Sequence, residues 1–238
     1  MPTTAVKRQA APLREQVVQA MRSEIIDGTL VPGERLLEKA LCERYGVSRT
    51  VIREVLRQLE SESLVSVRPG HGPAVARLSP GEIAGLYEVR RELEGLAAEL
   101  FARRADGAQA AALLALADRL ETDYLEGDTE SRGESKNEFY RLLLDGAGNP
   151  ALATVLDGIH ARIGIFRHFS FIDQERVKLS YVEILSIIEA AARDRDPAAA
   201  RASSEHHIEL AGKLAVLEYT KRYSSDPGET IAALRRIN

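Results

Sequence analysis

The sequence contains no tryptophan, a single cysteine and few aromatic residues, which make up 5% of its 238 residues. Because Cys42 has no second cysteine to pair with, the chain cannot form a disulfide framework, and a reducing cytoplasm is the expected location. No apolar run approaches the roughly 20 residues of a membrane span, and the N-terminus lacks the apolar core of a secretory signal. We therefore expect neither a disulfide-stapled secreted domain nor a membrane protein.

An overall excess of positive charge is also missing, since 32 Lys and Arg stand against 36 Asp and Glu, for a net charge of −4. The charge is nevertheless unevenly distributed along the chain. Residues 1–77 hold 12 basic and 9 acidic residues, whereas residues 78–238 hold 20 basic and 27 acidic ones. Basic charge thus gathers in the N-terminal third, as contact with nucleic-acid phosphates would require.

The most informative segment runs from Pro32 to Arg77 and predicts a helix-turn-helix followed by a wing. Gly46 fits the end of a short helix, where a left-handed conformation costs glycine little. Ser48 fits the N-cap of the next helix, because its hydroxyl can accept from a free amide of the first turn. A short turn between two helices is the arrangement that places the second one in a DNA major groove.

The second helix of this motif separates its apolar and basic residues by face. Its apolar residues recur at i, i+3, i+4 and i+7 and predict a core-facing stripe of Ile52, Val55, Leu56 and Leu59. Its arginines recur at i, i+4 and i+8 on a neighbouring solvent face, at Arg49, Arg53 and Arg57. Arginine can contact guanine edges or phosphates, so we expect this face to read DNA. The alternative is an ordinary solvated amphipathic helix.

The wing is predicted from the residues that follow. Residues 64–67 and 74–76 read as two strands, and residues 68–73 as the turn between them. Gly70 and Gly72 allow the backbone to approach DNA closely, and His71 at the tip is a candidate DNA contact. The alternative for His71 is a merely exposed loop histidine.

The rest of the chain predicts helices. Ser79, Pro80 and Glu82 form a helix start with a cap and a capping-box carboxylate. We expect helices at about 80–105, 107–126, 131–146, 150–171, 174–194 and 197–222, with one more short helix in the tail. The predicted fold is mainly α, an N-terminal winged helix-turn-helix followed by an antiparallel all-α bundle. The predicted parts are a flexible arm (1–11), the winged domain (12–77), an effector-binding and dimerisation domain (78–223) and a tail (224–238).

Three stretches carry a family resemblance: Pro32 to Leu36, Gly46 to Leu56, and Gly70 to Gly72. They resemble the winged helix of GntR-family bacterial transcription regulators, and the helical remainder resembles the FadR-type branch, whose effector domain is called FCD. The resemblance covers about residues 12 to 220. The DNA contacts that it implies here are Lys39, Ser48, Arg49 and Arg53, with Gly70 or His71 in the wing. We also expect Thr50 and Arg57 to contact DNA. Two departures are Lys39, where the family usually has arginine, and Ser63, where it usually has glycine.

This resemblance implies a ligand-responsive regulator that acts as a homodimer on a palindromic double-stranded DNA operator. A dimer would place its two recognition helices in successive major grooves, about 34 Å apart. A ligand bound in the helical bundle would change operator affinity by favouring one of two states. Repression relieved by a metabolite is the mode we expect, and activation is the alternative.

Many FCD domains hold a divalent metal with an aspartate, a histidine four residues later, and two histidines on later helices. The matching positions in this chain are Lys136, Tyr140 and Ile184, and only His207, or its neighbour His206, stands near the last one. One histidine cannot hold a metal tightly, so we predict no metal cofactor. Weak metal binding at the histidine pair is left open.

An ammonium at Lys136 brings positive charge to the place where the metal cation would lie. We therefore expect an anionic effector, an organic acid, bound by Lys136 and Tyr140 with Arg90 or Arg162 and with His207. In the alternative, Lys136 is exposed to solvent, Tyr140 only fills the core, and Arg90 or Arg91 pairs with Glu94.

Two further functions remain as alternatives. One is a FadR-like regulator that responds to acyl-CoA. The other, of a different class, is a helical small-molecule-binding or enzymatic protein whose winged helix mediates protein contacts. The sequence contains no His-Glu-x-x-His, no Gly-x-Ser-x-Gly and no phosphate-binding glycine loop, so we do not expect an enzyme.

Overall fold

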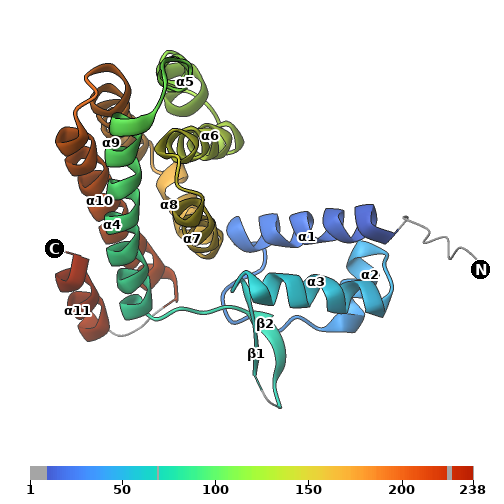
Figure 1. The fold of residues 1–238 in the computed structure, drawn as a ribbon. Helices are drawn as coiled ribbons and strands as arrows, with labels where there is room; N and C mark the ends of the chain where they lie inside the picture. Colours follow the sequence, from blue (N-terminus) through green and yellow to red (C-terminus); the bar gives the residue numbers. More distant parts are fainter. Residues whose placement is uncertain (1–9, 69, 224–226, 238) are drawn as a thin grey trace, which may run out of the picture. The chain divides into compact units, whose positions relative to one another are not determined.

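The fold is mainly α, as predicted, and was obtained as a computed structural model that describes residues 10–68, 70–223 and 227–237. The chain divides between Arg77 and Leu78 into two units (Figure 1). Each unit has a hydrophobic core of its own. None of the described helices is long and apolar enough to cross a membrane.

The first unit is a winged helix-turn-helix. Its elements in chain order are α1 (Ala10–Ile26), α2 (Glu38–Tyr45), α3 (Arg49–Ser61), β1 (Val65–Arg68) and β2 (Gly72–Val75). Its core holds Val18 and Met21 of α1 against Ile52 and Leu59 of α3, all with no exposed surface. Residues 1–9 of the predicted arm lie outside the described residues, and Ala10 and Ala11 already belong to α1.

The turn between α2 and α3 has the predicted geometry. Gly46 adopts the left-handed conformation, with φ 64° and ψ 32°, and its N–H donates to the Cys42 carbonyl. The Ser48 hydroxyl accepts a hydrogen bond from the Val51 N–H at 3.4 Å. The cap and the glycine together fix the direction in which α3 leaves the turn.

The wing strands differ from the predicted ranges. The antiparallel register pairs Val65 with Val75 and continues to a pair between Arg68 and Gly72. Both of these residues were expected in the turn, so the reversal is tighter than predicted. Gly70 and Gly72 have φ values of 77° and 75°, a conformation that glycine adopts without steric cost and that permits the sharper reversal.

The second unit consists of helices, and their starts follow the side-chain caps in the sequence. Ser79 and Glu82 form a capping box, as do Asp106 and Gln109, and Asp128 caps the helix that begins at Thr129. The elements are α4 (Pro80–Arg104), α5 (Gly107–Ala117), η1 (Glu121–Leu125), α6 (Thr129–Ala147), α7 (Pro150–Arg162), α8 (Gly164–Ile172), α9 (Gln174–Ile188), η2 (Glu189–Arg193), α10 (Pro197–Tyr223) and α11 (Pro227–Ile237).

Three helices that were predicted as continuous are interrupted. The helix expected at 107–126 ends at Ala117 and resumes as the π-helical turn η1, which buries Tyr124 in the core. The helix expected at 150–171 divides into α7 and α8 because Ile163 leaves the helical conformation, with φ −94° and ψ 3°. The helix expected at 174–194 ends at Ile188 and continues as the π-helical turn η2. The short helix expected in the tail is α11.

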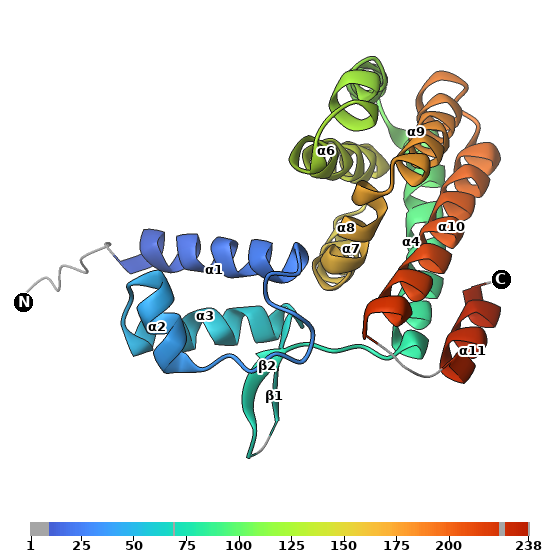
Figure 2. The ribbon, with the colours of Figure 1, turned by 180° about the vertical axis from the view of Figure 1, so that it is seen from behind.

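The long helices α4 and α10 lie side by side, with α11 against α4 (Figures 1 and 2). α6 crosses α4 at Gly146, where a Cβ would overlap the Phe101 ring. This close approach brings side chains of α4 and α6 together inside the unit.

Candidate nucleic-acid interface and interior polar clusters

α3 presents the two faces that the sequence predicted. Its apolar stripe is fully or nearly fully buried and consists of Ile52, Val55, Leu56 and Leu59. Arg49, Arg53 and Arg57 are exposed, as are Thr50 on the same helix and Lys39 on α2. The predicted reading residues of α2 and α3 therefore reach solvent.

Ion pairing distinguishes these basic residues from others in the first unit. Arg22 is paired with Glu62 at 2.7 Å and Arg44 with Glu24 at 2.9 Å. Within the described residues, by contrast, four basic side chains have no carboxylate within 4.0 Å. They are Arg35, Lys39, Arg49 and Arg57. Three of these four are predicted DNA contacts.

Arg53 is exposed but not unpaired. Its Nε donates to Glu38 Oε1 of α2 at 2.8 Å, and this hydrogen bond lowers the pKa of Glu38. Because the bond uses Nε, both terminal nitrogens of the guanidinium remain available to other acceptors. A forked contact made by two guanidinium nitrogens is the geometry that guanine recognition needs.

The backbone conformation at position 63 explains why the family usually has glycine there. Ser63, between α3 and β1, has φ 59°, in the left-handed region that favours glycine. The family's usual glycine therefore fits this position better than serine. At the wing tip, Gly70 and His71 are exposed, as a contact with DNA would require.

In the second unit, four polar side chains from three helices form the Glu94 cluster, which consists of Arg90, Glu94, Tyr140 and His160. Arg90 and Glu94 of α4 are paired at 2.7 Å, with 2% and 1% of their side chains exposed. Arg90 also donates to the Tyr140 hydroxyl of α6 at 3.2 Å, and His160 Nε2 of α7 lies 2.9 Å from Glu94 Oε1. Of the two arginines expected to pair with Glu94, Arg90 and Arg91, it is Arg90 that does so.

Electrostatics in the Glu94 cluster favour the ionised carboxylate. Burial alone would raise the pKa of Glu94, but the charge of Arg90 and the hydrogen bond from His160 outweigh it. The pKa of Glu94 therefore lies well below its usual range. One oxygen, Oε2, is buried without a hydrogen-bond partner among the described residues.

A second group, the Lys136 cluster, consists of Lys136, Arg176, Ser180, Glu183 and His207. Lys136 is only 3% exposed, and its Nζ donates to Ser180 Oγ at 3.4 Å. Arg176 makes two hydrogen bonds to Glu183, at 2.7 and 2.8 Å, and His207 Nδ1 lies 2.5 Å from Glu183 Oε2. The alternative of a solvent-exposed Lys136 is therefore wrong.

His207 is held in its neutral form. Burial, with the nearby charge of Lys136, lowers the pKa of His207 to about 4 although Glu183 acts in the opposite direction. The Nδ1–H of the neutral ring can donate to Glu183, which leaves the lone pair on Nε2. That Nε2 atom is buried without a hydrogen-bond partner among the described residues.

The residues at the family's metal positions do not fit a metal ion. An ammonium at Lys136 repels a cation, and Ile184, which is fully buried, has no donor atom. Tyr140 is engaged with Arg90, which leaves His207 as the one conventional ligand of the four positions. Among the described residues, no group of three His, Cys, Asp or Glu side chains could hold a metal.

Arg162 does not join the other predicted effector residues. It lies at the end of α7, where its charge helps to lower the pKa of Glu82 near the start of α4. Its half-buried side chain makes no hydrogen bond or ion pair with Lys136 or Tyr140. The structure instead brings Arg90 and Tyr140 together in one cluster, with Lys136 and His207 in the other.

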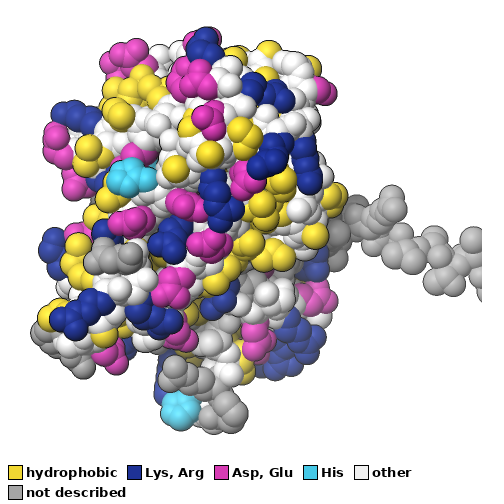
Figure 3. Space-filling model, turned by 60° about the vertical axis from the view of Figure 1, so that its left-hand side comes forward, with side chains coloured by type: hydrophobic (Ala, Val, Ile, Leu, Met, Phe, Trp, Pro, Cys, Tyr) yellow, Lys and Arg dark blue, Asp and Glu magenta, His cyan; other side chains and the backbone are white. Residues whose placement is uncertain are grey.

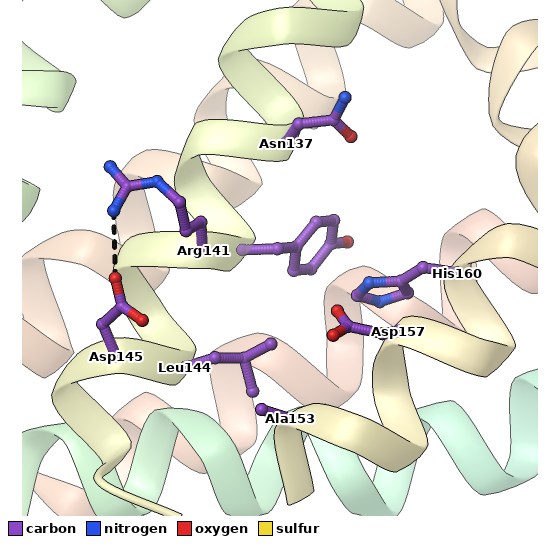
Figure 4. Close-up of a pocket in the computed structure, with 8 residues that line it drawn as sticks. Asn137, Arg141, Leu144, Asp145, Ala153, Asp157 and His160 are labelled. Carbon is purple, nitrogen blue, oxygen red and sulfur yellow. Dashed lines mark hydrogen bonds and ion pairs between the residues drawn. The ribbon is translucent and has the colours of Figure 1, made fainter. Parts of the chain in front are cut away.

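A pocket of about 320 Å³ opens between α6 and α7 (Figure 4). Tyr140 and His160 line it with their rings, whose centroids are 4.6 Å apart, and Asn137, Arg141 and Asp157 add polar groups. The pocket therefore connects solvent with two members of the Glu94 cluster. On the face shown in Figure 3, acidic and basic side chains are interspersed rather than gathered by sign.

Sequence reasoning did not identify several members of these clusters, namely His160, Arg176, Ser180 and Glu183. Each lies on a different helix from Lys136, so helical spacing gives no signal that they meet. A usable signal was the i, i+7 spacing of Arg176 and Glu183, two charges on one side of α9.

Family comparisons agree with these two units. The gntR family of bacterial regulatory proteins matches residues 13–75, and the FCD domain matches residues 85–210. The HTH-type transcriptional regulator McbR of Escherichia coli K12 is 28% identical over 198 residues, which cover 82% of this chain and 89% of McbR. The uncharacterized HTH-type regulator YdhC of Bacillus subtilis is 28% identical over 185 residues, or 77% and 83% of the two chains.

Solved structures show the same fold. Escherichia coli McbR/YncC superposes with a TM-score of 0.72 at 23% identity, covering 87% of this chain and 98% of that one. A putative GntR regulator from Rhodococcus sp. RHA1 gives a TM-score of 0.64 at 22% identity, covering 88% and 98%. The matched families and the relatives are transcription regulators, not enzymes.

Proposed function

Because this chain belongs to the gntR family of bacterial regulatory proteins and carries an FCD domain, we propose that it represses transcription until a small organic acid binds its second unit. The chain is a ligand-responsive DNA-binding regulator by family. The repressor role, the anionic effector, the palindromic operator, the homodimer and the cytoplasmic location are parts of the proposal.

The observation that carries the DNA-binding part is the exposed basic face of α3. Arg49 and Arg57 have no carboxylate partner among the described residues, and Arg53 is oriented by Glu38. Lys39, Ser48 and Thr50 would contact the backbone beside the bases read by α3, and Gly70 and His71 would contact the minor groove. The Ser48 hydroxyl already accepts a hydrogen bond as the cap of α3. We therefore expect the phosphate to be bound at this position by the free backbone N–H groups at the start of α3.

The test uses a duplex selected by the native protein from a random pool. Arg53→Ala should abolish specific binding in a gel-shift assay, with helicity and oligomeric state unchanged. Arg103→Ala serves as the control, since Arg103 is an exposed arginine of α4 in the second unit. Retained nanomolar binding by Arg53→Ala would count heavily against the proposal.

An excess of buried positive charge supports the anionic effector. Within the described interior of the second unit, the buried cations Arg90, Arg132, Lys136 and Arg176 outnumber the carboxylates Glu94 and Glu183. His207 is neutral and adds no charge at pH 7. A bound carboxylate would balance this excess, and burial would strengthen its attraction to Lys136.

We expect the effector to enter the second unit through the pocket between α6 and α7. Its volume of about 320 Å³ lies within the range of small-molecule sites. Beyond this pocket, the described interior of the second unit contains the charged side chains of the two clusters. Such a lining favours a compact polar acid over the long apolar chain of an acyl-CoA. We assign Arg90, Lys136, Tyr140 and His207 to the effector. Arg162 makes no hydrogen bond or ion pair with any of these four residues.

Thermal unfolding in the presence of organic acids, with and without a chelator, tests this part. We expect one or more acids to stabilise the native protein, and a chelator to leave that effect unchanged. Lys136→Met should lose the stabilisation, whereas Lys178→Met, at an exposed lysine of α9, should keep it. Chelator sensitivity, or full stabilisation of Lys136→Met, would overturn the proposed effector site.

A further inference from the structure

The segment before α2 pairs with β2 of the wing through an isolated bridge. The Gly33 N–H donates to the Val75 carbonyl at 3.0 Å, and the Val75 N–H donates to the Glu34 carbonyl at 2.9 Å. Arg35 forms an antiparallel bridge with Ala74 of β2. Arg35 is thereby fixed beside the hairpin, although α2 and α3 separate the two in the sequence.

Strand alternation shows which face Arg35 shares. Val65 and Val75 are paired across the hairpin and are both buried in the core of the first unit. Successive residues of a strand point to opposite faces, so the next pair, Ser66 and Ala74, faces away from that core. Arg35 is opposite Ala74 and therefore lies on the same outer face of the wing.

A pocket of about 210 Å³ lies on this outer face. Its polar side chains are Arg35, Ser66, His71 and Arg77, and neither Asp nor Glu lines it. Arg35, His71 and Arg77 are exposed, and Arg35 has no ion pair with any carboxylate of the described residues. Two guanidinium groups beside a hydroxyl and an imidazole are suited to the oxygens of a phosphate group.

We propose that this pocket binds a phosphate of the DNA backbone on the side of the wing that faces away from the first unit's core. The inference rests on the proposed DNA-binding function. A hairpin that enters a minor groove, about 6 Å wide, has a phosphate strand on either side. Arg35 and Arg77 on the outer face of the wing bind the phosphates of one of these two DNA strands, and α3 contacts the bases in the adjacent major groove.

Salt dependence of binding measures this interaction directly. Removal of one phosphate contact should lower the slope of log K against log salt concentration by about 0.9. The proposed dimer carries this pocket twice, so the double variant Arg35→Gln with Arg77→Gln should lower the slope by about 1.8, and each single variant by part of that amount. The decrease should be equal on the selected duplex and on a random duplex, because a phosphate contact carries no sequence information.

Two matched variants complete the design. Arg103→Gln removes the same charge from the second unit and should leave the slope unchanged, whereas Ser66→Asp puts a carboxylate into the pocket and should weaken binding to both duplexes. We expect each wing variant to unfold at the same temperature as the native protein, because the side chains of Arg35, Ser66 and Arg77 line a surface pocket. That result would exclude misfolding as the cause of weaker binding.

The outcomes separate this inference from the proposed function. If Arg53→Ala abolishes specific binding while the Arg35 and Arg77 variants keep the native slope, the pocket assignment is overturned and the regulator stands. If inorganic phosphate binds the DNA-free protein in an Arg35-dependent way and the slope is unchanged, the pocket takes a free anion and the DNA assignment is again overturned. If the native protein binds no DNA, both proposals fall.

Discussion

Acidification from pH 7.5 to 5 should destabilise the second unit by about 2 kcal/mol through His207 alone. Burial, with the charge of Lys136, lowers the pKa of this ring from 6.5 to about 4. The unfolded chain therefore binds a proton as the pH falls through 6.5, while the folded chain excludes it until the pH nears 4. Stability is fully present above pH 6.5 and is lost below it, and each pH unit in this window corresponds to about 1.4 kcal/mol.

Other groups around His207 do not mask the effect. Although burial would raise the pKa of Glu183, hydrogen bonds from His207 and Arg176 lower it to about 2. A lowered carboxylate pKa contributes stability that is lost only as the pH falls below its ordinary value of 4.5. The range between pH 7.5 and 5 therefore reports mainly on histidine.

Urea unfolding at the two pH values, followed by the near-UV signal of tyrosine, is the assay. Six of the seven tyrosines belong to the second unit, and only Tyr45 belongs to the first. His207→Gln should lose about 2 kcal/mol of the pH dependence, whereas His206→Gln, at the exposed neighbouring histidine, should keep it. Equal pH dependence in the native protein and in His207→Gln would refute the reasoning.

Three further predictions follow from backbone and packing. Ser63→Gly should stabilise the first unit by about 0.5–1 kcal/mol in urea unfolding, because relief of the left-handed strain at φ 59° exceeds the added chain entropy; no gain would contradict that account. Gly146→Ala should destabilise the second unit by about 1–2 kcal/mol in the same assay, since a Cβ would overlap the Phe101 ring and outweigh the helix propensity of alanine; a neutral change would show that Phe101 can move. Finally, Lys136→Asp, Tyr140→His and Ile184→His combined should create zinc binding measurable by calorimetry, because Nε2 of His207 is buried without a partner among the described residues and the repelling ammonium is removed; absence of binding would mean that these four positions do not converge.

Much of the first unit could be predicted because its signals are local. Gly46 and Ser48 each act on their own helix terminus, and the stripe from Ile52 to Leu59 follows from spacing within one helix. The wing was predicted as well, but its strand ends were wrong because the conformations of Gly70 and Gly72 decide how tightly the hairpin turns. Local sequence thus determines which elements form, and less well where they end.

The effector residues show where such reasoning stops. Lys136 and Tyr140 were found from a family position, but the sequence left open whether Lys136 is exposed. Packing decided that it is buried beside Ser180 of α9, while Tyr140 meets Arg90 of α4. Arg162 was expected as the alternative to Arg90, and packing placed it near Glu82 instead.

The sequence by itself determined the elements that would read DNA: a capped helix, the turn before it and arginines at helical spacing on its solvent face. Only the tertiary structure decided which distant residues meet, since Arg53 pairs with Glu38 of another helix and Arg35 lies against the wing from an earlier segment. The physical reason is that caps and helix faces depend on residues within one or two turns, whereas burial and ion pairing depend on which distant segments pack together.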